Sequence, residues 1–155
     1  MKLFAGFLGI ATGIGIFLIT WLAVYLNTKG TSFEFDAQGE KGAFEKLLVI
    51  YLDIAKFVLG LASASIVLLA GSSAFRSTPR LPESFRSPLF LLVLSVIFGI
   101  LFMVLLIFDY EHYRHHPDIR SYTKLKYTRN EALGFGSLGC FCVGYVWLIL
   151  IVTAP

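Results

Sequence analysis

The sequence predicts an all-α integral membrane protein, a bundle of four transmembrane helices joined by short connections. Four long apolar runs take up more than half of the chain. Hydrophobic residues make up 57% of the chain and charged residues only 15%. In an ordinary globular domain about a quarter of all residues are charged. The mean hydropathy is +0.77. Because no connection is long enough for a further domain, we expect residues 1–155 to form a single transmembrane domain.

The apolar runs predict spans at approximately 3–27, 47–72, 88–110 and 130–153. A hydrocarbon core about 30 Å thick needs roughly 20 helical residues, and each run reaches that length. The first run follows Lys2, as in a secretory signal. It is much longer than the apolar part of a signal peptide, which has about 7 to 15 residues. We therefore expect it to be retained as a span.

Local signals define the ends of the first helix and the segment that follows it. Gly30 comes shortly after Asn27, as expected where a helix stops. Phe33 and Phe35 alternate with polar neighbours. This alternation permits either a short strand or an edge that dips into the lipid head groups.

The starts of the third and fourth helices carry capping signals. Ser87 followed by Pro88 predicts an N-cap and a first helical residue. The third helix can then continue beyond its apolar part through 109–116. Thr128, with Glu131 three residues later, has the pattern of a capping box. We therefore expect the fourth helix to begin close to Arg129.

Basic residues concentrate in the second and third connections. We expect them to face lipid head groups or a partner protein, since cations meet phosphate at the membrane surface. They are Arg76, Arg80, Arg86, Arg114, Arg120, Lys124, Lys126 and Arg129.

If all four runs cross the membrane, one side holds eight Lys or Arg residues and the other side four. The positive-inside rule then favours an orientation with both termini outside.

Small residues recur four apart in every span, a spacing that lets helix backbones approach closely in lipid. We expect these rows to form the helix-packing surfaces of the bundle. In the first, third and fourth spans they comprise Ala5, Gly9, Gly13, Ser95, Gly99, Gly136, Cys140 and Gly144.

The second span differs because it joins charged and small residues on one face. At about 100° per residue, Asp53, Lys56, Gly60, Ser63 and Ala64 share one third of the helix circumference. Two interpretations stay open. Either Lys56 reaches the head groups at the end of an amphipathic lead-in helix, or the Asp53/Lys56 pair lies inside the bilayer and marks a transport path or subunit contact. In both cases we expect this face to be turned toward protein.

The histidines lie just after the third span. His112, His115 and His116 form H-x-x-H-H, which resembles one histidine box of the membrane-bound fatty-acid desaturases and hydroxylases. That resemblance implies iron held by several such boxes, and this chain has three His in total. A single metal on His112 and His116, assisted by Glu111 or Asp118, is geometrically possible. We nevertheless expect solvated histidines and no bound metal or other cofactor.

Two further sequence motifs do not indicate a disulfide or a nucleotide-binding site. Cys140 and Cys142 are two residues apart on a helix, so their side chains diverge and cannot form a disulfide. Gly134, Gly136 and Gly139 spell G-x-G-x-x-G, but the dinucleotide motif needs a preceding strand and a helix N-terminus at the phosphates. These glycines are expected to serve helix packing.

Packing signals without a catalytic constellation favour a non-enzymatic protein. We expect an accessory, assembly or immunity-type subunit that packs against another membrane protein, or against its own copies, through small-residue faces. The alternative is a small oligomeric channel or transporter with Asp53 and Lys56 on its path, and an interfacial metal enzyme is the least favoured. The expected partners are the lipid bilayer and a membrane protein or a second copy, with no nucleic acid.

Overall fold

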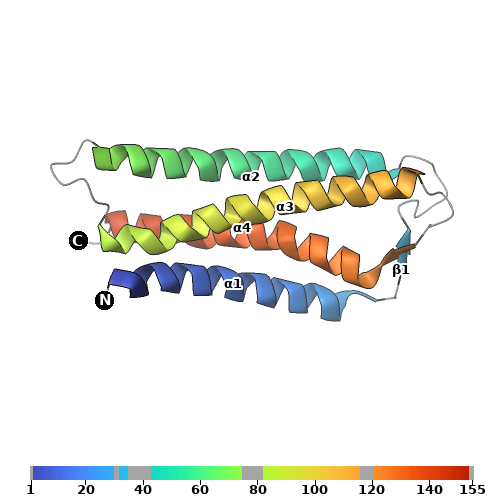
Figure 1. The fold of residues 1–155 in the computed structure, drawn as a ribbon, viewed down its shortest axis with the longest axis horizontal. Coiled ribbons are helices and arrows are strands. Elements are labelled where there is room, and N and C mark those ends of the chain that lie inside the picture. Colours follow the sequence, from blue (N-terminus) through green and yellow to red (C-terminus); the bar gives the residue numbers. More distant parts are fainter. Residues whose placement is uncertain (1, 30–31, 35–42, 75–81, 116–120, 154–155) are drawn as a thin grey trace.

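The computed structural model describes residues 2–29, 32–34, 43–74, 82–115 and 121–153. Its four long helices are α1 (Lys2–Asn27), α2 (Ala43–Ala74), α3 (Arg86–His115) and α4 (Lys124–Thr153). They contain 26 to 32 residues, so each is about 40 to 48 Å long at 1.5 Å per residue. All four are long and apolar enough to cross a membrane. The predicted all-α four-helix bundle is confirmed (Figure 1).

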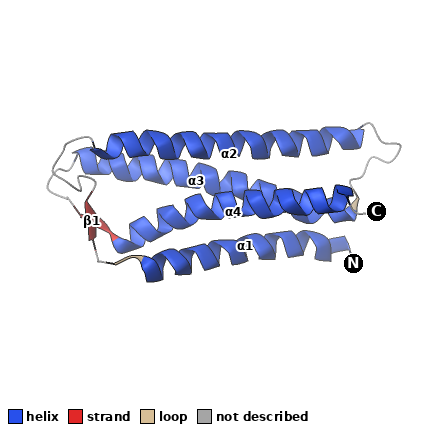
Figure 2. Cartoon of the chain, turned by 180° about the vertical axis from the view of Figure 1, so that it is seen from behind, coloured by secondary structure: helices blue, strands red, loops and turns tan. Residues whose placement is uncertain are grey.

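The bundle is organised around the contact between α3 and α4. α1 packs on both of these helices, whereas α2 lies mainly on α3 and touches α4 over a short stretch. Seen from either side, α1 and α2 flank the central pair on opposite sides (Figures 1 and 2). In the described residues α1 and α2 do not approach each other. α2 therefore leaves a large part of its surface uncovered by the rest of the chain.

A small two-stranded ribbon closes one end of the bundle. β1 (Ser32–Glu34) pairs antiparallel with β2 (Ser121–Thr123), and Phe33 lies opposite Tyr122. Of the two arrangements that the sequence permitted at Phe33, the chain adopts the strand. Phe35 and Gly30 lie outside the described residues. The ribbon ties the segment after α1 to the start of α4 (Figure 2).

α4 begins earlier than its capping pattern predicted. Its first residue is Lys124, and the Oγ1 atom of Thr123 accepts a hydrogen bond from the backbone N–H of Lys126 at 3.4 Å. Thr123 is therefore the N-cap. The prediction that Thr128 and Glu131 form a capping box near Arg129 is wrong. Thr128 is fully buried inside the helix, and within the described residues its hydroxyl has no hydrogen-bond partner.

α3 also begins before its predicted first residue. A 3-10 turn, η1 (Glu83–Phe85), precedes it and runs directly into the helix at Arg86. Ser87 is therefore a buried helical residue and not the N-cap. Pro88 still lies within the first helical turn, where a missing N–H costs no intrahelical hydrogen bond. The expected continuation of α3 beyond its apolar part is confirmed as far as His115.

Hydrogen bonds between two serines join α3 to α4 at the middle of the bundle. The Ser95 hydroxyl donates to the Ser137 carbonyl oxygen at 2.8 Å, and the Ser137 hydroxyl donates to the Ser95 carbonyl oxygen at 2.8 Å. Both side chains are buried. Such reciprocal bonds require the two backbones to lie very close together, and Gly99 allows this because a Cβ there would lie 3.0 Å from Ser137 Oγ.

Other small residues lie at close backbone contacts between helices. A Cβ on Gly144 of α4 would lie 3.1 Å from Leu91 Cβ of α3, and one on Gly9 of α1 would lie 2.5 Å from the Ser87 carbonyl oxygen. Gly13 and Gly136 are also buried against neighbouring helices. The buried Cys140 thiol donates weakly to the Gly13 carbonyl oxygen at 3.9 Å. The side chain of Ala5 lies outside the described part.

We expect Gly9→Ala to destabilise the bundle by about 1 to 3 kcal/mol, because the new methyl group meets rigid backbone. The matched control is Gly15→Ala on the same helix, where a Cβ has nothing within 4 Å. That variant should be neutral or up to about 1 kcal/mol more stable, since Ala favours helix over Gly. Unfolding midpoints in detergent measure both changes. Equal midpoints for the two variants would contradict the observed packing of α1 on α3.

Candidate functional site

The predicted face of α2 points away from the bundle. Asp53, Lys56, Gly60, Ser63 and Ala64 are all exposed, meaning that the rest of the chain does not cover them. The opposite side of the helix carries the buried Val58 and Ala62. Nothing in the described residues lies within 4 Å of a Cβ built on Gly60. Among the described residues of one chain, this face therefore contacts no other helix.

An ion pair occupies the same outward face of α2. Lys56 Nζ lies 3.3 Å from Asp53 Oδ1, and the two side chains are 66% and 65% exposed. An exposed pair three residues apart on a helix contributes little to stability in water. Both charges lie on the surface of α2 that the described residues leave uncovered.

A largely covered carboxylate, Asp109, organises the polar end of the α3/α4 contact. The Asp109 side chain is only 12% exposed and accepts hydrogen bonds from Arg129 Nη2 at 2.7 Å and Asn130 Nδ2 at 3.0 Å. Lys126 Nζ lies 3.7 Å from its other oxygen. Arg129 Nε also donates to Asn130 Oδ1 at 3.1 Å. This network neutralises Asp109 and fixes the start of α4 against the end of α3.

The Asp109 network was not predicted from the sequence. Lys126 and Arg129 were expected to face head groups or a partner, but both engage Asp109 inside the chain. Lys124 instead lies over the Tyr25 ring, 4.2 Å from its centroid. Arg86 is half-buried and Arg114 is exposed. Three further residues of the basic set lie outside the described part, namely Arg76, Arg80 and Arg120.

Glu131 lies on the outer ridge of α4 between two grooves. Glu131, Phe135 and Leu138 follow the i, i+4, i+7 spacing of one helix face, and these three residues line both grooves. The larger groove, about 730 Å³, lies between α1 and α4. The smaller groove, about 200 Å³, lies between α2 and α4 and is floored by α3. Within the described residues the Glu131 carboxylate has no hydrogen bond or ion pair.

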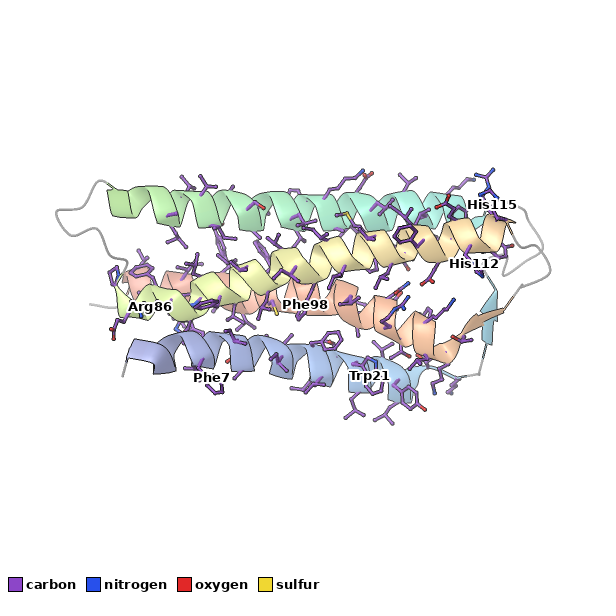
Figure 3. The ribbon with its side chains drawn as sticks, viewed as in Figure 1. Phe7, Trp21, Arg86, Phe98, His112 and His115 are labelled. Carbon is purple, nitrogen blue, oxygen red and sulfur yellow. The ribbon has the colours of Figure 1, made fainter. Side chains whose placement is uncertain are left out.

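His112 and His115 lie in the last turn of α3 and do not line either groove. His112 and His115 are exposed (Figure 3), and His115 Nε2 lies 4.0 Å from Glu111 Oε1. His116 and Asp118 are outside the described residues. In the part of the chain that is described, no three His, Cys, Asp or Glu side chains are placed to hold a metal ion.

Three groups of polar side chains in the described chain are thus the outward face of α2, the Asp109 network and the Glu131 ridge. Cys140 is buried in the helix contacts and Cys142 is exposed at the inner end of the α1/α4 groove, and neither forms a disulfide. Comparison of the chain with protein-family models, curated proteins and solved structures finds no match. Function is therefore inferred from these surfaces.

We expect Asp109→Ala to lower the free energy of unfolding by about 2 kcal/mol. The substitution leaves Arg129 and Asn130 without their acceptor, and losing one partner of a buried ion pair costs about 3 to 5 kcal/mol. The smaller value applies because Arg129 is 38% exposed. The control Glu111→Ala, at an exposed position of the same helix, should stay within about 0.5 kcal/mol. Denaturation in detergent micelles compares the two, and equal losses would contradict the structural role of Asp109.

Proposed function

We propose that this chain is a non-enzymatic membrane subunit that assembles through the outward face of α2. The observation that carries the proposal is the direction of that face. Small residues of α1, α3 and α4 such as Gly9, Gly99 and Gly144 pack within the chain, whereas Gly60 and Ala64 of α2 are uncovered. Small residues four apart let a second helix approach closely in lipid. This unused row is therefore the surface available for association.

The charges of α2 favour a second copy of this chain as the occupant. Two copies in one membrane share the same orientation, so a two-fold axis along the membrane normal would set their α2 helices side by side. Asp53 and Lys56 would then meet the same two residues of the partner at the same depth. Each acid could bind either base, and the paired face is complementary to itself. A different transmembrane protein would need both a small-residue row and matching charges.

The alternative role as a channel or transporter requires such an assembly as well. The centre of one chain is filled by buried side chains, among them Leu91, Leu92 and Ser95. A path past Asp53 and Lys56 would therefore have to run between copies and not through one chain. An α2-mediated assembly is the first requirement of either role.

We further infer that the end of the bundle with the β-ribbon faces the cytoplasm. Lys29, Lys124, Lys126 and Arg129 lie at this end, where α1 ends and α4 begins. Lys and Arg concentrate on the cytoplasmic side of membrane proteins. In this orientation both termini lie on the opposite side of the membrane.

Cysteine crosslinking in native membranes tests the proposed assembly. In a background with Cys140→Ala and Cys142→Ser, we expect Ala64→Cys to give a disulfide-linked dimer on mild oxidation. The controls Leu18→Cys on α1 and Val146→Cys on α4 are similarly exposed, at 57% and 56%, and should remain monomeric. Crosslinking of Ala64→Cys only to a different protein would replace the second copy with a heterologous partner. Equal crosslinking at all three positions would refute a specific role for α2.

A bulky residue at Gly60 should weaken the same assembly. Gly60→Leu adds a side chain in open space, so it leaves the fold of one chain intact while separating two α2 helices. We expect association in detergent to fall roughly tenfold, which corresponds to about 1.4 kcal/mol. Analytical ultracentrifugation measures the dimer constant, and an unchanged unfolding midpoint verifies the fold. Unchanged association would exclude Gly60 from the interface.

A further inference from the structure

The groove between α1 and α4 has the dimensions of a lipid-sized ligand. Its α4 wall runs from Tyr127 to Cys142, which is about 22 Å at 1.5 Å per residue. Its volume is about 730 Å³, within the range of about 300 to 1,000 Å³ of small-molecule sites. The groove follows the helix axes along the outside of the bundle, so a ligand could enter it directly from the membrane.

The lining of this groove changes from polar to apolar along its length. Near the β-ribbon it is formed by Asn27, Thr28, Lys29 and Tyr127, and further in by apolar side chains such as Phe135 and Leu138. Glu131 lies at the boundary. From Glu131 to Cys142 the groove runs about 16 Å, close to half of a hydrocarbon core about 30 Å thick. It therefore offers a polar mouth and an apolar channel as deep as one membrane leaflet.

Glu131 is the acidic side chain at this boundary, and the exposed Lys29 is a cation at the polar mouth of the same groove. The described residues give its carboxylate no hydrogen bond or ion pair, because the nearby Arg129 and Lys126 are held by Asp109. The polar groups of Asn27 and Thr28 donate to carbonyl oxygens of α1 at 2.9 and 2.6 Å. An ionised carboxylate beside lipid is costly without a cation. A cationic ligand group at the Glu131 carboxylate would therefore stabilise its charge, as long as it lies deeper in the groove than Lys29.

Aromatic rings border the carboxylate on both sides. Tyr127 lines the α1/α4 groove beside Glu131, and Tyr51 lines the α2/α4 groove beside it. The negative face of a tyrosine ring attracts an organic cation. A carboxylate flanked by tyrosines is suited to an ammonium group that carries an apolar substituent.

We propose that this groove binds a single-chain amphiphile with an ammonium head, with the head at Glu131 and the chain along Phe135 and Leu138 toward Cys142. The order of groups along the groove supports this ligand class over a phospholipid. In an amine-bearing phospholipid the ammonium lies outside the phosphate. Binding that ammonium at Glu131 would therefore draw the phosphate into the apolar part of the groove. In an alkylammonium the chain follows the head directly, as the groove requires.

Binding of dodecylammonium to the full chain tests this proposal. The protein is reconstituted in phosphatidylcholine nanodiscs and titrated calorimetrically below the micelle concentration, with empty nanodiscs as the background. We expect saturable binding that Glu131→Gln weakens by at least about tenfold. Glu111→Gln, an exposed carboxylate outside the groove, should bind like the unaltered chain. Dodecanoate, with the same chain and the opposite charge, should show no saturable binding.

A second variant tests the position of the chain without altering the charge. Cys142→Trp fills the inner end of the groove, at a position that is exposed and forms no disulfide. We expect it to weaken dodecylammonium about tenfold relative to octylammonium, since only the longer chain reaches that end. This comparison tests whether the alkyl chain lies along the groove even if Glu131→Gln fails to fold.

Three results would overturn the proposal. They are binding that does not exceed that of empty nanodiscs, equal binding by a folded Glu131→Gln variant, and an unchanged chain-length preference in Cys142→Trp. Loss of α2-mediated dimers in Gly60→Leu should leave dodecylammonium binding unchanged, so the two proposals fail independently.

Discussion

The close approach of α3 and α4 is the contact on which the other helix positions depend. Helices in lipid gain little from burying apolar side chains against each other, so association needs short backbone distances and interhelical hydrogen bonds. Ser95 and Ser137 provide two such bonds, and Gly99 and Gly144 provide the space. With this pair fixed, α1 packs on both helices through Gly9 and Gly139. α2 packs mainly on α3 and leaves its other side open.

The rotation of α4 at this contact decides what each of its polar residues can do. Successive helical residues point about 100° apart. Asn130 falls on the side that faces α3 and reaches Asp109, whereas Glu131 falls on the outer ridge with Phe135 and Leu138. Neighbours in the sequence thus take different roles, one in the network that fixes the helix and the other at the mouth of a groove. The same serine contact that holds α4 in place therefore turns Glu131 outward.

The sequence predicted features that depend on one helix and missed those that depend on two distant segments. Apolar run length indicated the four long helices, and helical periodicity grouped Asp53 with Gly60 and Ala64 on one face. Periodicity could not say which way that group points, because the direction depends on Val58 and Ala62 packing against the bundle. The start of α4 was misplaced since pairing of β2 with β1, 89 residues away at Phe33 and Tyr122, leads the chain into the helix at Thr123. The Asp109 network likewise joins residues twenty apart.

The arrangement of the bundle separates its two candidate surfaces. The outward face of α2 lies opposite the side by which α2 packs on α3. α1 lies across the central helix pair from α2 (Figure 1), and the ridge of α4 that carries Glu131 separates the α1/α4 groove from the α2/α4 groove. A helix bound along Gly60 and Ala64 would therefore not cover the groove. Conversely, a ligand at Glu131 would lie between α1 and α4 and near Tyr51 of α2, which is on the side of that helix opposite Asp53. An amphiphile beside α1 and a second helix on the outward face of α2 would therefore occupy separate surfaces of one chain.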